Sequence, residues 1–256
     1  MQYVIAIAAV VPIRSDASHK AEMVSQLLLG EAAEVFEAKA DFTKIRCLYD
    51  GYEGWCANSQ LAPVENIDSV KPVTYTITRS AAALLNGTNV PLSLATPVFS
   101  RIAAGNFVIE FIEENIPIGI IEEDNRDAFI KQFTYRYLNT PYLWGGKSSA
   151  GIDCSGFTQQ VFKVLGIPLL RDAYQQATQG ELISNLDEAK CGDLAFFDNT
   201  EGRITHVGIL LDNSTIIHAS GYVRIDTIDN SGITHSITGA KTHKLKLVKR
   251  MGAATC

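Results

Sequence analysis

The chain has 256 residues, 46% of them hydrophobic and 20% charged, which is enough to bury a proper core in one large domain or two to three small ones. Its formal net charge of −6 argues against nucleic acid or an anionic membrane as partner and suits a substrate with cationic groups. The sequence has no run near the ~20 apolar residues of a membrane span.

The N-terminal stretch 4–13 is apolar over roughly the length of a signal-peptide core. No Lys or Arg precedes it, and it passes directly into "VPIRSDASHKAEM". We therefore expect a first strand of the fold, with export as the alternative.

The five cysteines are odd in number and have no regular framework spacing: Cys47, Cys56, Cys154, Cys191 and Cys256. This pattern favours a reducing compartment, so we expect a cytoplasmic protein. A disulfide joining Cys47 and Cys56 across a hairpin remains an alternative.

Residues 1–65 alternate or run apolar over five to seven residues, with Gly51, Gly54 and Pro63 as breaks. Short strands at this spacing predict a small β-barrel. Residues 66–120 repeat this pattern of short apolar or alternating runs in "VTYTITRSAAALL", "VPLSLATPVFS" and "FVIEFIEE", which predicts a second, degraded barrel.

Residues 125–256 change character. Phe129, Phe133 and Tyr137 recur every fourth residue after a capping Asp124 or Asn125, and Pro141 ends that helix. A second helix follows Cys154, and strands follow in "DLAFFD", "ITHVGILLD", "TIIHAS", "VRIDTI" and "HKLKLVKR". Helices followed by an antiparallel meander predict an α+β domain.

Cys154 lies in the glycine-rich stretch "SSAGIDCSGF", directly before the apolar helix pattern. If the helix begins at Ser155 or Gly156, its unpaired N–H groups and dipole favour a thiolate. The flanking glycines leave room for a substrate carbonyl. On this local pattern alone, a small buried hydrophobic cysteine is an equal alternative.

Two of the five histidines lie in strand patterns, whereas His19, His235 and His243 have polar surroundings typical of a surface. If 212–214 is a three-residue hairpin loop, His206 and His218 are diagonal neighbours on one face, roughly 7 Å or less apart. Such a pair suits a general base and the group that orients it. Two strand histidines bonded to backbone, or a zinc site with a cysteine, are the alternatives.

Four motifs in order, "TPYLWGGKSSAGIDCSGFTQQVF", "CGDLAFFD", "ITHVGILLD" and "IIHASG", closely resemble the NlpC-type cell-wall cysteine peptidases. The resemblance implies a papain-like domain over 125–256, with Cys154 as nucleophile, His206 as base and His218 as third member. It also implies that the Tyr142 hydroxyl and the Cys154 backbone N–H bind the oxyanion.

Upstream, "VVPIRSDASHKAEMVSQLLLGE" and "YDGYEGWCANSQL" resemble a bacterial SH3-like domain. Two such barrels before an NlpC-type domain resemble the γ-D-glutamyl-L-diamino acid endopeptidases, which cut murein peptides that carry a free N-terminal L-alanine. The resemblance implies that acidic side chains bind the substrate ammonium: Asp172 from the catalytic domain, and Glu53 or Asp50 from the first barrel. An ordinary helix cap is the alternative for Asp172.

Asp153 and Ser155 match substrate-contacting positions of that subgroup. Ala173 stands where the subgroup often has a serine, which removes one hydrogen bond to the substrate. The sequence thus predicts an α+β papain-like domain preceded by two SH3-like barrels.

The predicted function is hydrolysis of the γ-D-glutamyl–diaminopimelate bond during recycling of wall peptides. The prediction includes no cofactor, no metal, no nucleic-acid or membrane partner, and a monomer. An amidase or acyltransferase on the same core, and a non-catalytic wall-binding adaptor, are the alternatives.

Overall fold

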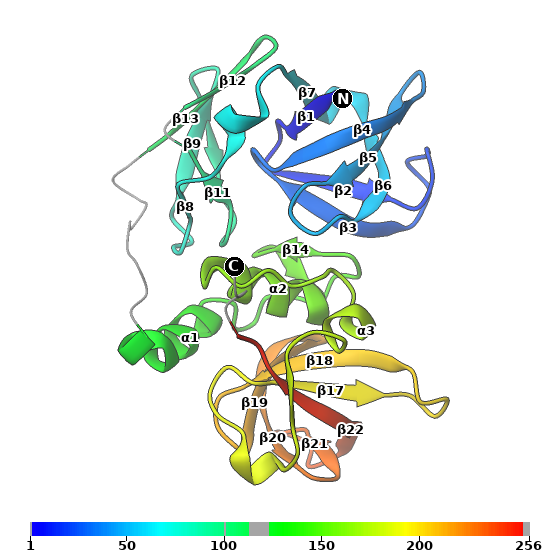
Figure 1. The fold of residues 1–256 in the computed structure, drawn as a ribbon, viewed down its shortest axis with the longest axis vertical. Helices are drawn as coiled ribbons and strands as arrows, with labels where there is room; N and C mark the ends of the chain where they lie inside the picture. Colours follow the sequence, from blue (N-terminus) through cyan, green and yellow to red (C-terminus); the bar gives the residue numbers. More distant parts are fainter. Residues whose placement is uncertain (1, 100, 113–122, 253–256) are drawn as a thin grey trace. The chain divides into compact units, whose positions relative to one another are not determined.

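The computed structural model describes residues 2–99, 101–112 and 123–252 (Figure 1). The chain divides into an N-terminal unit, residues 1–119 with 144–150, and a C-terminal unit, residues 120–143 with 151–256. Cys256 and residues 113–120 of the predicted second barrel lie outside the described residues.

Seven antiparallel strands build the first part of the N-terminal unit, in the order β3-β2-β6-β5-β4-β1-β7. They are β1 (Tyr3–Ala6), β2 (Val10–Arg14), β3 (Met23–Leu28), β4 (Ala32–Ala38), β5 (Phe42–Cys47), β6 (Glu53–Ala57) and β7 (Leu61–Val64), with a 3-10 turn at Asn58–Gln60. The strands predicted over 1–65 are therefore present.

The apolar stretch 4–13 forms β1 and β2, two strands where one was expected. Successive side chains of a strand point to opposite faces. Val4 and Ala6 pack into the core of the first barrel, whereas Ile5 and Ile7 belong to a second core. Burial on both faces explains why this stretch has the uninterrupted apolar character of a signal-peptide core.

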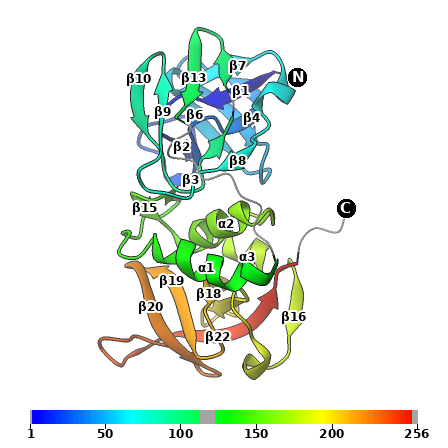
Figure 2. The same cartoon turned by 90° about the vertical axis from the view of Figure 1, so that its left-hand side faces the viewer.

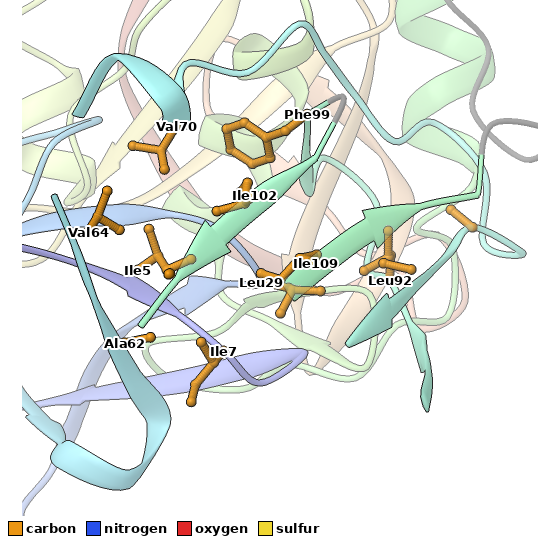
Figure 3. Close-up of a cluster of buried hydrophobic side chains, with 13 residues drawn as sticks. Ile5, Ile7, Leu29, Ala62, Val64, Val70, Leu92, Phe99, Ile102 and Ile109 are labelled. Atoms are coloured by element: carbon orange, nitrogen blue, oxygen red, sulfur yellow. The ribbon is translucent and has the colours of Figure 1, made fainter. Parts of the chain in front are cut away.

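The second core joins the first barrel to the strands that follow it (Figure 3). These strands are β8 (Thr74–Tyr75), β9 (Ala82–Leu85), β10 (Thr88–Pro91), β11 (Pro97–Val98), β12 (Ile102–Ala104) and β13 (Phe107–Phe111), after a 3-10 turn at Ile67–Val70. They form a sheet in the order β10-β9-β13-β12 and a separate β11–β8 pair. Phe99, Ile102 and Ile109 share one cluster with Ile5 and Leu29. A second SH3-like barrel over 66–120 stays a prediction.

Cys47 and Cys56 are free, buried thiols in the barrel core. Cys47 lies opposite Ala33, and Cys56 lies opposite Thr43. The disulfide considered between them is therefore wrong.

The C-terminal unit holds the helices α1 (Arg126–Tyr135), α2 (Cys154–Val164) and α3 (Ala173–Gln176), with a 3-10 turn at Glu123–Asn125 before α1. Asn125 occupies the predicted N-cap position of α1, but its side chain makes no capping hydrogen bond. Phe129 stacks on Phe133, Phe133 meets Tyr137 edge-on, and Tyr137 meets Phe157 of α2 in the same way. This aromatic row packs α1 and its C-terminal extension against α2.

The predicted meander closes into a six-stranded barrel because the last strand pairs with both β17 and β21. Figure 2 shows it beside the helices, and α2 and α3 contact β18. Its strands are β17 (Leu194–Asp198), β18 (Ile204–Leu210), β19 (Thr215–Ser220), β20 (Tyr222–Asp229), β21 (Gly232–Thr234) and β22 (Lys241–Arg250). The remaining elements are β14 (Lys147–Ser148), β15 (Gly151–Ile152), β16 (Glu181–Ile183) and a 3-10 turn at Leu186–Glu188.

Among the described residues, no helix combines the length and apolar character that crossing a bilayer requires.

The shared core predicts that damage at β13 destabilises the first barrel. Trp55 and Trp144 are the two tryptophans, so in a Trp144→Phe background Trp55 alone reports on that barrel. Ile109→Ala empties a fully buried position and should cost about 2–5 kcal/mol in urea unfolding followed by Trp55 fluorescence. Val73→Ala, at an exposed position, should cost little. An unchanged Trp55 transition in Ile109→Ala would show that the two parts unfold independently.

Candidate active site

Cys154 is the first residue of α2, one or two positions earlier in the helix than expected. The preceding Asp153 is the N-cap residue, and its Oδ1 accepts a hydrogen bond of 2.6 Å from the Gly156 N–H. A first-turn N–H has no carbonyl partner within its own helix. The position of the Cys154 N–H in the first turn is compatible with the oxyanion role that the resemblance implies, and that role stays a prediction.

The Cys154 thiol is buried and accepts hydrogen bonds from the backbone N–H groups of Val207 and Ser155. Val207 directly follows His206 on β18, so the thiol lies beside the strand that carries the predicted base. Burial, and then the charge of Asp153, raise the pKa of the thiol to about 12. The expected resting thiolate is therefore wrong: desolvation outweighs the helix N-terminus, and the thiol rests protonated.

The two strand histidines meet as the hairpin register predicts. Ile209 pairs with Ile217 and Leu210 with Ile216, and the Leu211 N–H donates to Thr215 O. The His206 Nε2 atom lies 2.8 Å from the His218 Nδ1 atom. This hydrogen bond confirms that the two imidazoles lie together on one face.

Gly208 makes room for this pair. A Cβ atom at position 208 would lie 2.8 Å from the His218 Cβ atom and 2.7 Å from Ile216 Cδ1. Glycine is the residue that lets the neighbouring strand bring its imidazole this close.

Sequence reasoning missed three side chains around the histidines. Asp226 on β20 places Oδ2 2.9 Å from His218 Nε2, and Arg224 Nε donates to the same oxygen over 2.9 Å. His243 on β22 stacks on His206, with ring centroids 4.2 Å apart. His243 is half-buried, so its expected surface position is wrong. The one available signal was the polar residues at 224 and 226, which alternate with apolar residues in "VRIDTI" and so share one face of the strand.

His206 rests as a neutral base. Burial lowers its pKa well below the ordinary 6.5, and the neighbouring His218 and His243 lower it further. Near neutral pH the site therefore pairs a protonated thiol with a neutral imidazole.

Tyr142 is half-buried in the same unit, and its N–H donates to Gly221 O over 2.8 Å. Burial raises the pKa of its hydroxyl well above the ordinary 10.0, and the nearby Cys154 adds to this. The hydroxyl therefore keeps its proton at neutral pH, as an oxyanion donor must. Its role in catalysis stays a prediction.

Asp153 and Ser155 are buried and held by Arg171, which is 1% exposed. Arg171 Nη2 donates to Asp153 Oδ2 over 2.6 Å, and Nη1 donates to Asp153 Oδ1 and Ser155 Oγ, each over 3.0 Å. This bidentate pair fixes the start of α2, and therefore the position of Cys154. Substrate contact by Asp153 or Ser155 stays a prediction.

Of the three acids predicted to bind ammonium, only Asp172 belongs to the C-terminal unit. It is half-buried and is the N-cap residue of α3, where its N–H donates to Gln175 Oε1 over 3.1 Å. In the N-terminal unit, Glu53 is exposed and pairs with Arg46 Nη2 over 2.7 Å. Asp50 Oδ1 accepts from the Tyr52 N–H. The ammonium-binding roles of all three stay predictions.

Within the described part of the chain, no group of three or more His, Cys, Asp or Glu residues is arranged to hold a metal ion.

Comparison with known proteins identifies both parts of the chain. Residues 139–242 match the NlpC/P60 family, and residues 13–61 match the bacterial dipeptidyl-peptidase SH3 domain. Residues 139–242 therefore form an NlpC/P60 domain. The NlpC/P60 match spans Tyr142, Cys154, His206, His218 and also Asp226.

Two relatives are named γ-D-glutamyl-L-lysine dipeptidyl-peptidase. The Bacillus subtilis protein is 35% identical over 182 residues, which are 66% of this chain and 60% of that protein. The Bacillus cereus protein is 25% identical over 258 residues, covering 87% of this chain and 75% of its own length. An NlpC/P60 crystal structure from Bacillus cereus shares the fold, with a TM-score of 0.76, 19% identity and coverage of 97% of this chain and 99% of that one.

The Arg171–Asp153 pair of this NlpC/P60 domain predicts a double-mutant signature. Arg171→Met leaves the buried Asp153 carboxylate without its partner and should cost about 3–5 kcal/mol. The double variant with Asp153→Asn removes the unpaired charge and should regain part of that loss. Urea unfolding followed by circular dichroism measures both. A loss below about 1 kcal/mol in the single variant would contradict the proposed anchoring of α2.

His243 predicts how acid affects stability. Burial, and then the neighbouring His218 and Arg224, lower its pKa from 6.5 to about 4. Between these values the unfolded chain binds a proton that the folded chain does not, so stability falls as pH is lowered through this window. His243→Phe keeps an aromatic ring but removes the titration. Its unfolding midpoint should drop less between pH 7 and pH 5 than that of the wild type, and an equal drop would contradict the assignment.

Proposed function

We propose that this protein is a cysteine peptidase that hydrolyses the bond from γ-D-glutamate to an L-diamino acid in murein peptides with a free N-terminal L-alanine. The observation that carries this proposal is the placement of Cys154, at the start of α2, against strand β18, which carries His206 of the His206–His218 pair, within an NlpC/P60 domain. A thiol with an adjacent oriented imidazole is the arrangement of a nucleophilic acyl-transfer site.

The reaction proceeds in two acyl-transfer steps. His206 takes the proton of Cys154 as Sγ attacks the γ-carbonyl carbon of D-glutamate. The Tyr142 hydroxyl and the Cys154 N–H bind the oxyanion, each worth about 3 kcal/mol of barrier. His206 then gives its proton to the leaving amine as the C–N bond breaks. Water hydrolyses the thioester with His206 as base, and the thiol is restored.

A protonated resting thiol fits this order of events. Charge separation in a buried thiol–imidazole pair is unfavourable until a carbonyl is present to accept the electrons. Proton transfer to His206 therefore accompanies attack on the substrate carbonyl.

The names of the two Bacillus relatives support a γ-D-glutamyl substrate with L-lysine in the third position. Diaminopimelate, which the sequence resemblance implied, differs from lysine by one carboxylate on the side chain. The proposed substrate class is therefore the γ-D-glutamyl-L-diamino acid peptide, with both residues to be compared. Recycling of wall fragments in the cytoplasm is the proposed context, and cell fractionation tests it.

The test is hydrolysis of L-Ala-γ-D-Glu-L-Lys, its meso-diaminopimelate counterpart and the N-acetylated form of each. Wild type should release L-Ala-D-Glu from the free-amine peptides only. Cys154→Ala should lower turnover by roughly 10⁵-fold or more, since the nucleophile is lost. Cys191→Ala, which removes a half-buried thiol whose Sγ contacts the Asp127 carbonyl of α1, should retain full activity.

Cleavage of the acetylated peptides at an equal rate would contradict the requirement for a free amine. Turnover of none of these peptides, with hydrolysis or acyl transfer on other amides, would favour the amidase or acyltransferase alternative. Binding of wall fragments without turnover, unaffected by alkylation of Cys154, would favour the adaptor.

A further inference from the structure

A fourth side chain extends the Cys154, His206 and His218 set into the barrel. Asp226 is 1% exposed. Its carboxylate is hydrogen-bonded to one imidazole nitrogen, one guanidinium N–H and one backbone N–H. Its Oδ2 meets His218 Nε2 and Arg224 Nε, and its Oδ1 accepts from the Ser236 N–H over 2.9 Å. Asp226 is therefore held as a carboxylate at the inner end of the histidine pair.

The hydrogen-bond directions along this row follow from Asp226. An ionised carboxylate only accepts, so His218 Nε2 must carry a proton and donate it to Oδ2. In a neutral imidazole the other nitrogen is then an acceptor, so His218 Nδ1 accepts. The His206 Nε2–H consequently donates to it across 2.8 Å. His206 Nδ1 is left with its lone pair.

The reverse direction is excluded on electrostatic grounds. In the reverse direction His218 Nε2 would be unprotonated. Its lone pair would then face a lone pair of Asp226 Oδ2 across 2.9 Å in a buried site, which is unfavourable. A doubly protonated His218 is disfavoured because burial lowers its pKa, and this effect outweighs the hydrogen bond to Asp226, which raises it.

The rings packed around His206 fix the orientation of its imidazole. His243 stacks on His206 with an interplanar angle of 23°, and Phe197 lies 5.7 Å away from the His206 ring centre. These rings hold the imidazole plane, so the lone pair and the N–H do not exchange places by rotation.

We propose that Asp226 is a positioning residue that acts through His218 to keep His206 in the Nε2–H tautomer, with the Nδ1 lone pair available for the thiol proton of Cys154. This inference rests on the proposed function only for the reaction in which that proton moves.

The charged and titratable groups around the row come from four strands and one turn. They are His206 on β18, His218 on β19, Arg224 and Asp226 on β20, His243 on β22, and His235 after β21, whose charge acts on His218. Several charged and titratable groups thus surround the two imidazoles, so tautomers rather than a single pKa are the primary readout.

The first experiment uses wild-type protein and needs no peptide substrate. In protein labelled with ¹⁵N histidine at pH 7.5, the imidazole nitrogens of His206 and His218 should show unprotonated Nδ1 and protonated Nε2. A protonated Nδ1 on either ring would overturn the proposal, whatever the enzyme cleaves.

The second experiment compares Asp226→Asn with Asp229→Asn. Asp229 lies on the same strand, but it is exposed and pairs with Lys241. Asparagine can turn its amide N–H toward His218, which reverses the proton order and puts a proton on His206 Nδ1. In Asp226→Asn, kcat/KM should fall by about 10²–10⁴-fold with little change in KM. Asp229→Asn should match the wild type.

Alkylation of Cys154 by iodoacetamide, read by peptide mass spectrometry, separates this proposal from the choice of substrate. Asp226→Asn should slow it by at least about tenfold at pH 7.5, because the general base is lost. Its ¹⁵N spectrum should also show a protonated Nδ1 on His206. If the wild type alkylates normally but cleaves no murein peptide, the proposed function fails and this inference stands. Unchanged tautomers and unchanged alkylation in Asp226→Asn would overturn it.

Discussion

The hydrogen bond between His206 Nε2 and His218 Nδ1 is the interaction around which the C-terminal unit is organised. It lies inside a six-stranded barrel in which a polar group without a partner would cost roughly 1–3 kcal/mol. Asp226 provides the hydrogen-bond partner of the second His218 nitrogen. Gly208 leaves the space that lets the two adjacent strands bring the rings together. The same burial keeps the imidazoles neutral and the Cys154 thiol protonated.

The position of Cys154, the proposed nucleophile, depends on a second buried polar anchor. Arg171 holds both carboxylate oxygens of Asp153, and Asp153 caps the helix that begins with Cys154. The helix start and the barrel thus hold the proposed nucleophile and the proposed base on fixed elements, as preorganised acyl-transfer chemistry requires. The N-terminal unit uses apolar burial instead, with one strand, β1, contributing alternate side chains to two cores.

Local patterns predicted the helices, the strands and the histidine hairpin because each depends on residues close in the chain. The three-residue loop at 212–214 was enough to place His206 and His218 together. Asp226 and His243 were missed because their roles depend on how β20 and β22 close the barrel, which periodicity does not encode. The thiol pKa was predicted in the wrong direction because the sequence shows a helix start but not the depth at which it is buried. Burial on both faces likewise gave β1 its resemblance to a signal-peptide core.

The most direct test of the account is to trap the thioester. Wild-type protein would be mixed with L-Ala-γ-D-Glu-p-nitroanilide, quenched in acid within the burst of p-nitroaniline release, digested with pepsin and analysed by mass spectrometry. The account predicts an L-Ala-γ-D-glutamyl group on the peptide that contains Cys154, and on no peptide that contains another cysteine. Burst release of p-nitroaniline with the acyl group on a different residue, or an undiminished burst in Cys154→Ala, would contradict it.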